Sequence, residues 1–151
     1  MKCLFCYQEL HDGEQHYHAA CAKRFFGSPV IPSMPYSQAD IRELAKQVVR
    51  SHTTVTGVQA KLSMDIERTN QISRLTIVDQ GGKYILKPQT PQYPYLPEIE
   101  DLTMHLAQSV KIDVVPHALL RFDSGERCYL TRRIDRDKKG IKIAMEDMCQ
   151  L

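Results

Sequence analysis

The sequence of 151 residues contains no long hydrophobic run. Its uninterrupted apolar stretches are only a few residues long, far short of the roughly 18 that a membrane-spanning helix needs. A signal peptide is absent as well, because residues 1–9 become polar before an apolar segment could form. We therefore expect a cytoplasmic protein that does not contact a membrane.

Charge of one sign is also scarce. Lys and Arg number 20, Asp and Glu number 18, and the formal net charge is only +2. This balance gives no reason to expect direct binding to nucleic acid. Hydrophobic residues make up 42% of the chain and charged residues 25%, close to globular averages, which excludes wholesale disorder. The length allows one domain with a small appendage.

The cysteines do not suit a disulfide framework. There are five, an odd number, and no secretory signal accompanies them. Three of the five lie within the first 21 residues. The other two, Cys128 and Cys149, are interpreted as small buried apolar residues.

The three N-terminal cysteines and one histidine have the spacing of a metal site. The pattern Cys-x2-Cys-x11-His-x2-Cys is formed by Cys3, Cys6, His18 and Cys21. Each x2 pair can bind one edge of a tetrahedral zinc ion, and so short a segment cannot bury a core without metal. His11 and His16 compete for the third position, but His18 is preferred because it pairs with Cys21. Four protein ligands would make this zinc structural; the alternative is a set of free thiols and surface histidines.

The chain divides into three parts. Residues 1–27 form the expected zinc-ribbon or LIM-like Cys/His knot, residues 28–37 a proline-rich linker, and residues 38–151 the main body. In the main body the hydrophobic period switches between that of helices and that of strands. Helices are expected over 38–51 and 97–110, strands over 58–66, 72–78, 83–87, 114–121 and 127–131, a short strand at 141–144, and a helix beginning at 145. This order predicts an α+β fold, a sheet with a helix packed on one face.

Five segments of the main body carry short motifs. They are 54–61 with the core G-x-Q-x-K, 84–88 around a strand lysine, 98–107 with a glutamate-rich helix start, 130–136 ending in I-D-R, and 146–150 reading E-D-M-C-Q. Together they resemble the HipA/HipT family of bacterial toxin serine/threonine kinases, in which short HipT-like members also carry an N-terminal Cys/His knot. The resemblance implies a kinase-like N-lobe with an antiparallel sheet, and ATP and Mg²⁺ as cofactors of the complete kinase.

The resemblance also assigns roles to single residues. The nucleotide-binding residues that it implies are Gly57, Val58, Gln59, Lys61, Lys87, Glu100 and Arg132. Thr54 and Thr56 match positions at which the family carries autophosphorylated serines. A phosphate there adds about −2 charge beside the nucleotide and is expected to oppose ATP binding. The alternative interpretation makes these threonines a β-prone turn edge, and Gln59 and Lys61 solvated strand residues.

The chemistry of Lys87 and Glu100 agrees with these roles. A strand lysine can contact phosphates as a point charge, and a helix glutamate can hold it by an ion pair. The strand of Lys87 is expected to be buried, so its amine needs a partner. Glu100 is the best-placed acid, and Asp101 is the fallback, because the two side chains point about 100° apart on one helix. The alternative is an ordinary exposed lysine at a strand end.

Several groups that complete a kinase are missing. Catalysis needs an aspartate that orients the acceptor, a metal-binding asparagine and a second metal-binding aspartate, all of which follow the hinge. The single asparagine, Asn70, has a D-x4-N spacing from Asp65, but both precede Lys87 and the match is rejected. We therefore assign no catalytic residue to this chain and expect it to be inactive alone, either as a truncated product or as one half of a pair.

The implied function is that of the N-terminal ATP-binding lobe of a serine/threonine kinase toxin in a toxin–antitoxin system. The implied partners are ATP, a HipB-like antitoxin, a HipS-like small protein and an aminoacyl-tRNA synthetase as protein substrate. The alternative is a non-catalytic, zinc-stapled binding or regulatory module that pairs with a separate chain. A LIM- or ribbon-like adaptor would explain residues 1–27 alone.

Overall fold

The computed structural model of the protein describes residues 1–51, 60–69, 72–78, 81–137 and 141–144. Helices and strands follow one another along these residues. Their bounds are α1 Ala19–Phe26, α2 Gln38–Ser51, β1 Leu62–Thr69, β2 Ile72–Ile77, β3 Tyr84–Lys87, α3 Leu96–Ser109, β4 His117–Arg121 and β5 Arg127–Arg132. No helix within these ranges is long and apolar enough to cross a membrane. The fold is α+β, as the sequence predicts.

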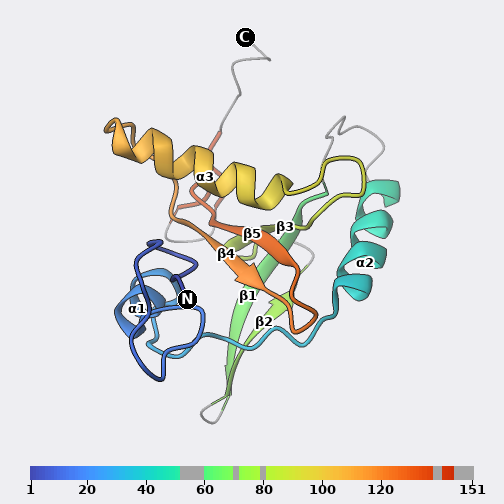
Figure 1. Ribbon diagram of the computed structural model, residues 1–151. Helices are drawn as coiled ribbons and strands as arrows, with labels where there is room; N and C mark the ends of the chain where they lie inside the picture. The colour runs from blue at the N-terminus through green and yellow to red at the C-terminus, as the bar shows by residue number, and fades with distance from the viewer. Residues whose placement is uncertain (52–59, 70–71, 79–80, 138–140, 145–151) are drawn as a thin grey trace.

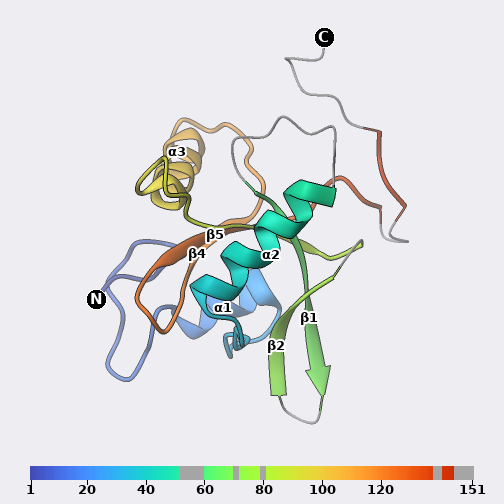
Figure 2. The same cartoon turned by 90° about the vertical axis from the view of Figure 1, so that its right-hand side faces the viewer.

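The strands form one antiparallel sheet in the order β2-β1-β3-β5-β4 (Figure 1). Phe25 of α1 and Ile41 of α2 belong to the same buried cluster as Leu86 of β3 and Leu130 of β5. Successive strand residues point to opposite faces, so the neighbouring residues of these strands face away from that core. α3 packs on β4 and β5 and lies well apart from α1 and α2 (Figure 2). The sheet therefore separates an apolar core from the face that carries α3.

The helix expected over 38–51 is confirmed, and its start has a local cause. Ser37 Oγ accepts a hydrogen bond from the Asp40 N–H at 3.2 Å, and the Asp40 carboxylate accepts one from the Ser37 N–H at 2.8 Å. These reciprocal bonds form a capping box, which satisfies donors that the first turn of a helix leaves unpaired. The helix expected over 97–110 is likewise present as α3, with Pro97 in its first turn.

Two strands begin three or four residues later than expected. The strand predicted over 58–66 starts at Leu62, and its first two residues lie outside the described ranges. The strand predicted over 114–121 starts at His117. Pro116 explains the second difference, because proline has no N–H to donate to a ladder.

The chain after β5 is less regular than expected. The strand predicted at 141–144 is reduced, in the described part of the chain, to one isolated bridge between Arg136 and Lys142. The helix predicted from residue 145 lies outside the described residues.

α1 is a helix that the sequence pattern does not predict. It ends at Gly27, whose φ of 77° is left-handed and whose N–H donates to Lys23 O at 2.9 Å. Its last two residues, Phe25 and Phe26, are buried under the sheet. α1 is an amphipathic stretch of only about two turns, and it overlaps the Cys/His pattern that dominates this part of the sequence.

Both edges of the sheet are covered by N-terminal residues. At the β4 edge, the Leu119 N–H donates to Leu4 O at 3.2 Å, and the Tyr17 hydroxyl donates to Leu119 O. At the β2 edge, the Ser33 N–H donates to Ser73 O at 2.9 Å, and the Leu75 N–H donates to Ser33 O at 2.8 Å. The Cys/His segment and the proline-rich segment are thus built onto the sheet and cover part of each edge, where unpaired backbone groups invite association.

Candidate functional site

An ion pair joins the end of β3 to the first half of α3. Lys87 Nζ lies 2.8 Å from Glu100 Oε2, and both side chains are about three-quarters buried, with 24% and 23% of their surface exposed. Lys87 Nζ also lies 5.4 Å from the centre of the Tyr129 ring, which is its neighbour in register on β5. The amine donates a hydrogen bond to the carboxylate and lies within cation–π distance of the aromatic ring. The pair therefore holds the Lys87 amine in one position on the α3 face of the sheet.

The next residue of α3 has a different environment. Asp101 is completely buried, and its carboxylate accepts hydrogen bonds from His117 Nδ1–H of β4 at 2.7 Å and from the Tyr7 hydroxyl. Residues next to each other in a helix point about 100° apart, so Glu100 faces the lysine while Asp101 faces the N-terminal segment and β4. Burial raises the pKa of the Tyr7 phenol, and the negative carboxylate of Asp101 raises it further, so the hydroxyl stays protonated and donates.

Two other residues expected at the nucleotide site, Lys61 and Arg132, occupy different positions relative to Lys87. Lys61 is exposed and directly precedes Leu62, whose partner in register, Leu86, directly precedes Lys87. The two lysines therefore sit at the same end of adjacent strands. Arg132 is exposed, and the alternation of β5 turns it away from the face that carries Tyr129. Arg132 is thus on the opposite face from Lys87.

Five further candidates precede β1 in the sequence. Thr54, Thr56, Gly57, Val58 and Gln59 lie outside the described residues.

Several residues of this region carry no signal in the sequence. Tyr129, His117 and Tyr7 surround the two acids of α3, but they come from strands and a loop far away in the sequence. The contact between Tyr7 and Asp101 spans 94 positions. Only the pairing of β3 with β5 brings Tyr129 to Lys87, and no local pattern signals it.

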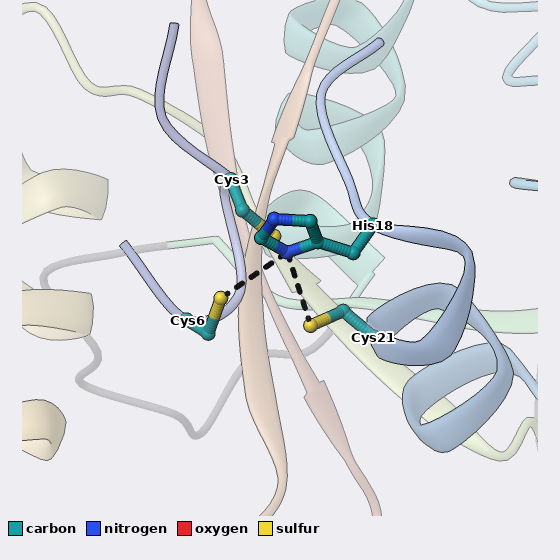
Figure 3. A group of neighbouring side chains, drawn as sticks. All are labelled: Cys3, Cys6, His18 and Cys21. Atoms are coloured by element: carbon teal, nitrogen blue, oxygen red, sulfur yellow. Dashed lines mark hydrogen bonds between the residues drawn. The ribbon is translucent and has the colours of Figure 1, made fainter. Parts of the chain in front are cut away.

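A second candidate site lies in the N-terminal segment (Figure 3). Its ligand atoms all lie within 4.8 Å of one another and belong to Cys3, Cys6, His18 and Cys21. His18 Nδ1 is 3.4 Å from Cys6 Sγ and 3.7 Å from Cys21 Sγ. The other ring nitrogen, Nε2, donates its hydrogen to Glu9 O at 2.8 Å. In the neutral imidazole that bond leaves Nδ1 without a proton and directed at the sulfurs, which is how metal-binding histidines are oriented.

The local backbone and the charges of the cluster also suit a cation. The Tyr7 N–H donates to Cys3 O at 3.0 Å and closes the turn that carries Cys3 and Cys6. Burial raises the pKa of the Cys3 thiol, but backbone N–H groups of Phe5, His18 and Cys6 lower it by more, so the pKa lies below its usual value. Burial raises the pKa of Cys21 to about 12, with help from the other two sulfurs. A metal cation would allow all three sulfurs to ionise together.

The competing histidines lie outside this cluster. His11 forms a separate group with Glu14 and His18, and its ring centre is 5.3 Å from that of His18. His16 belongs to neither group within the described ranges. Three sulfurs and one imidazole nitrogen form a donor set that zinc accepts in structural sites, so the residues present fit a bound metal ion.

Comparison with known proteins gives two matches. The family model described as "HipA-like C-terminal domain" matches residues 53–151. A protein of Haemophilus influenzae that carries the name "Putative kinase" is 32% identical over 122 residues, which cover 78% of this chain and 34% of that protein. The chain thus spans about a third of the length of this relative.

Proposed function

The chain belongs to the HipA-like, kinase-related family, and on that premise we propose that residues 38–151 form the ATP-binding lobe of a serine/threonine protein kinase. The observation that supports this proposal best is the ion pair between Lys87 and Glu100. In protein kinases a lysine of the third strand pairs with a glutamate of the helix that follows. Lys87 ends β3 and Glu100 lies in α3, the next element of the chain, so the order is the same.

Each residue of the proposed nucleotide site has a distinct role. Lys87 contacts phosphate oxygens as a fixed positive charge, and Glu100 holds it in place. Lys61 adds a second positive charge at the same end of the sheet. Backbone N–H groups around Gly57, Val58 and Gln59 would surround the phosphates. Phosphorylation of either nearby threonine, Thr54 or Thr56, would place negative charge there and oppose ATP.

We propose zinc as the metal of the N-terminal cluster. Cys3 Sγ, Cys6 Sγ, Cys21 Sγ and His18 Nδ1 would hold it. Four protein ligands leave no position open for a substrate, so the ion stabilises the segment and takes no part in phosphoryl transfer.

For the whole protein we propose the wider function that the family resemblance implies. The complete kinase would transfer the γ-phosphate of ATP to serine or threonine of a protein, with an aminoacyl-tRNA synthetase as candidate substrate. A HipB-like antitoxin and a HipS-like small protein are the proposed partners. A non-catalytic, zinc-stapled binding or regulatory module that pairs with a separate chain is the second candidate, and the Cys/His cluster of the N-terminal segment supports it.

Nucleotide titration with a fluorescent ATP analogue and Mg²⁺ tests the proposal. Replacing Lys87 by Ala should weaken binding by about 10- to 100-fold, the value of a hydrogen bond to a charged group. Lys83→Ala is the matched control. Lys83 directly precedes β3, at the end of the strand opposite Lys87, and its side chain is 78% exposed. Equal affinity of wild type, Lys87→Ala and Lys83→Ala would overturn the ATP-binding lobe. Binding without phosphoryl transfer by the chain alone would support it.

A further inference from the structure

We propose that the N-terminal segment positions α3, and that it does so through a clasp formed by Tyr7, Asp101, His105 and His117. Through this clasp the segment sets the position of Glu100 against Lys87. The effect on nucleotide affinity rests on the proposed function, whereas the effect on α3 itself does not. Tyr7 and His105 are thus positioning residues, which act through α3 without contact to the nucleotide.

The clasp has two points of attachment on α3, one helical turn apart. At the first, the Tyr7 hydroxyl donates to the Asp101 carboxylate, which also accepts His117 Nδ1–H at 2.7 Å. At the second, His105 Nε2–H donates to Phe5 O at 3.0 Å. The Tyr7 ring stacks on the His105 ring, with centres 4.3 Å apart and planes inclined by 13°. Residues 5–7 therefore contact two successive turns of one side of the helix.

α3 depends on polar contacts because it buries little apolar surface. Among its residues only Pro97 and Asp101 are buried. Ile99, Leu102 and Leu106 are each at least half exposed. A helix is usually held on a sheet by an amphipathic apolar face. In α3 the only fully buried apolar residue is Pro97, and Leu96, Met104 and Ala107 are only partly buried. The polar contacts of α3 are the clasp, the Lys87–Glu100 pair and a pair between Glu98 and Arg127 at 3.2 Å.

The position of Glu100 follows from that of Asp101. The two residues are consecutive in a rigid helical turn, so a rotation that releases Asp101 turns Glu100 by the same angle. The bond from Tyr7 to Asp101 fixes this rotation from one side, and His117 fixes it from the sheet. Loss of either donor should therefore give Glu100 more freedom and leave Lys87 with a less constant partner.

Two tyrosines of the same segment allow a matched test. Tyr7→Phe removes the hydroxyl that reaches α3, and Tyr17→Phe removes a hydroxyl that donates to Leu119 O of β4. Amide hydrogen exchange of the whole chain, measured by mass spectrometry without nucleotide, reports on α3 directly. Tyr7→Phe should speed exchange in α3 by about tenfold, as expected for one lost bond to a charged acceptor. Tyr17→Phe should leave α3 as protected as in wild type.

A second pair of variants examines the other attachment. His105→Phe keeps a stacking ring and removes the Nε2–H donor to Phe5 O, together with Nδ1, which lies 2.9 Å from Asp101 O in the same helix. His105→Gln keeps a donor that can reach Phe5 O. Exchange in α3 should be faster in His105→Phe and partly restored in His105→Gln. Unchanged α3 exchange in both Tyr7→Phe and His105→Phe, or equal effects of Tyr7→Phe and Tyr17→Phe, would overturn the clasp.

Nucleotide titration of the same variants separates the clasp from the proposed function. If the clasp positions the pair, Tyr7→Phe should bind the fluorescent ATP analogue about tenfold more weakly than Tyr17→Phe. A wild-type chain that binds no nucleotide would overturn the ATP-binding lobe, and the exchange experiment would still decide the clasp. Faster α3 exchange in Tyr7→Phe with unchanged nucleotide affinity would overturn the inference that α3 sets the nucleotide site.

Discussion

Loss of charge should have different effects at Glu100 and at Asp101, two neighbouring acids of α3. Asp101 is fully buried and accepts hydrogen bonds from two donors, whereas Glu100 is 23% exposed and pairs with one lysine. We predict that Asp101→Asn lowers the free energy of unfolding more than Glu100→Gln does, whereas Glu100→Gln acts mainly by lowering nucleotide affinity. The two changes are chemically alike, so their different effects report on the environment alone.

The magnitudes follow from these contacts. Asparagine keeps one acceptor oxygen but turns an NH₂ group toward either Tyr7 or His117, so one bond to a buried charge is lost. Such a bond contributes about 1.5–3 kcal/mol, and we expect Asp101→Asn to lower the free energy of unfolding by this amount. Water can reach Lys87 and replace its partner, so Glu100→Gln should cost about 1 kcal/mol or less.

Urea unfolding provides the assay. The chain contains no tryptophan, so far-ultraviolet circular dichroism is the suitable signal. Glu98→Gln serves as control, because Glu98 lies in the same first turns of α3 and shares the favourable interaction of acids with the helix dipole. Its pair with Arg127 is partly exposed, and its loss should resemble that of Glu100 in stability. Equal destabilisation by Asp101→Asn and Glu100→Gln would refute the reasoning.

Three further predictions concern the metal, the core and the pH dependence of stability. Protein purified without added metal should contain about one equivalent of zinc by elemental analysis, since closed sites bind tightly; no zinc in native or reconstituted protein would contradict the Cys/His assignment. Phe25→Ala should lower the free energy of unfolding by about 3–5 kcal/mol, as for other buried phenylalanines. Circular dichroism should show a single unfolding transition, and a separate transition of residues 1–27 would contradict a core shared with the sheet. Hydrogen bonds from Arg133 lower the pKa of Asp135 to about 2. The free energy of unfolding of wild type should therefore exceed that of Asp135→Asn by its full amount above about pH 5, and this difference should decrease as pH falls from about 4 toward 2. A difference in urea unfolding that stays constant across that range would show that the ion pair does not stabilise the protein.

Local signals account for what the sequence predicted well. α2 follows from the apolar periodicity and from Ser37 and Asp40, which are three positions apart. The pairing of Lys87 with Glu100 joins residues 13 positions apart in adjacent elements, and a family motif marks each of them. In these cases the interacting groups are close enough in sequence for a pattern to relate them.

The features that the sequence did not predict depend on distant contacts. α1 is short, and its phenylalanines are explained only by the sheet that covers them. Asp101 was considered only as a substitute for Glu100, because its donor Tyr7 lies 94 positions away. Arg132 was grouped with Lys87 by motif order, but the alternation of β5 places it on the opposite face. Each of these three features depends on the tertiary fold and not on a local sequence pattern.

The contacts at the sheet edges explain why metal binding at the Cys/His cluster should stabilise the sheet and α3, which do not contribute ligands. An open antiparallel sheet of this size has two free edges, and here Leu4 and Tyr17 contact one edge while Ser33 contacts the other. Ordering the loops that provide these contacts costs conformational entropy, about 1–2 kcal/mol for each backbone residue fixed. The turn from Cys3 to Cys6 contains Leu4, which bonds to β4, and Phe5, which bonds to α3, and Tyr7 follows it directly. A bound ion that fixes this turn would therefore stabilise the edge of the sheet and the position of α3 together, because the same few residues provide both contacts.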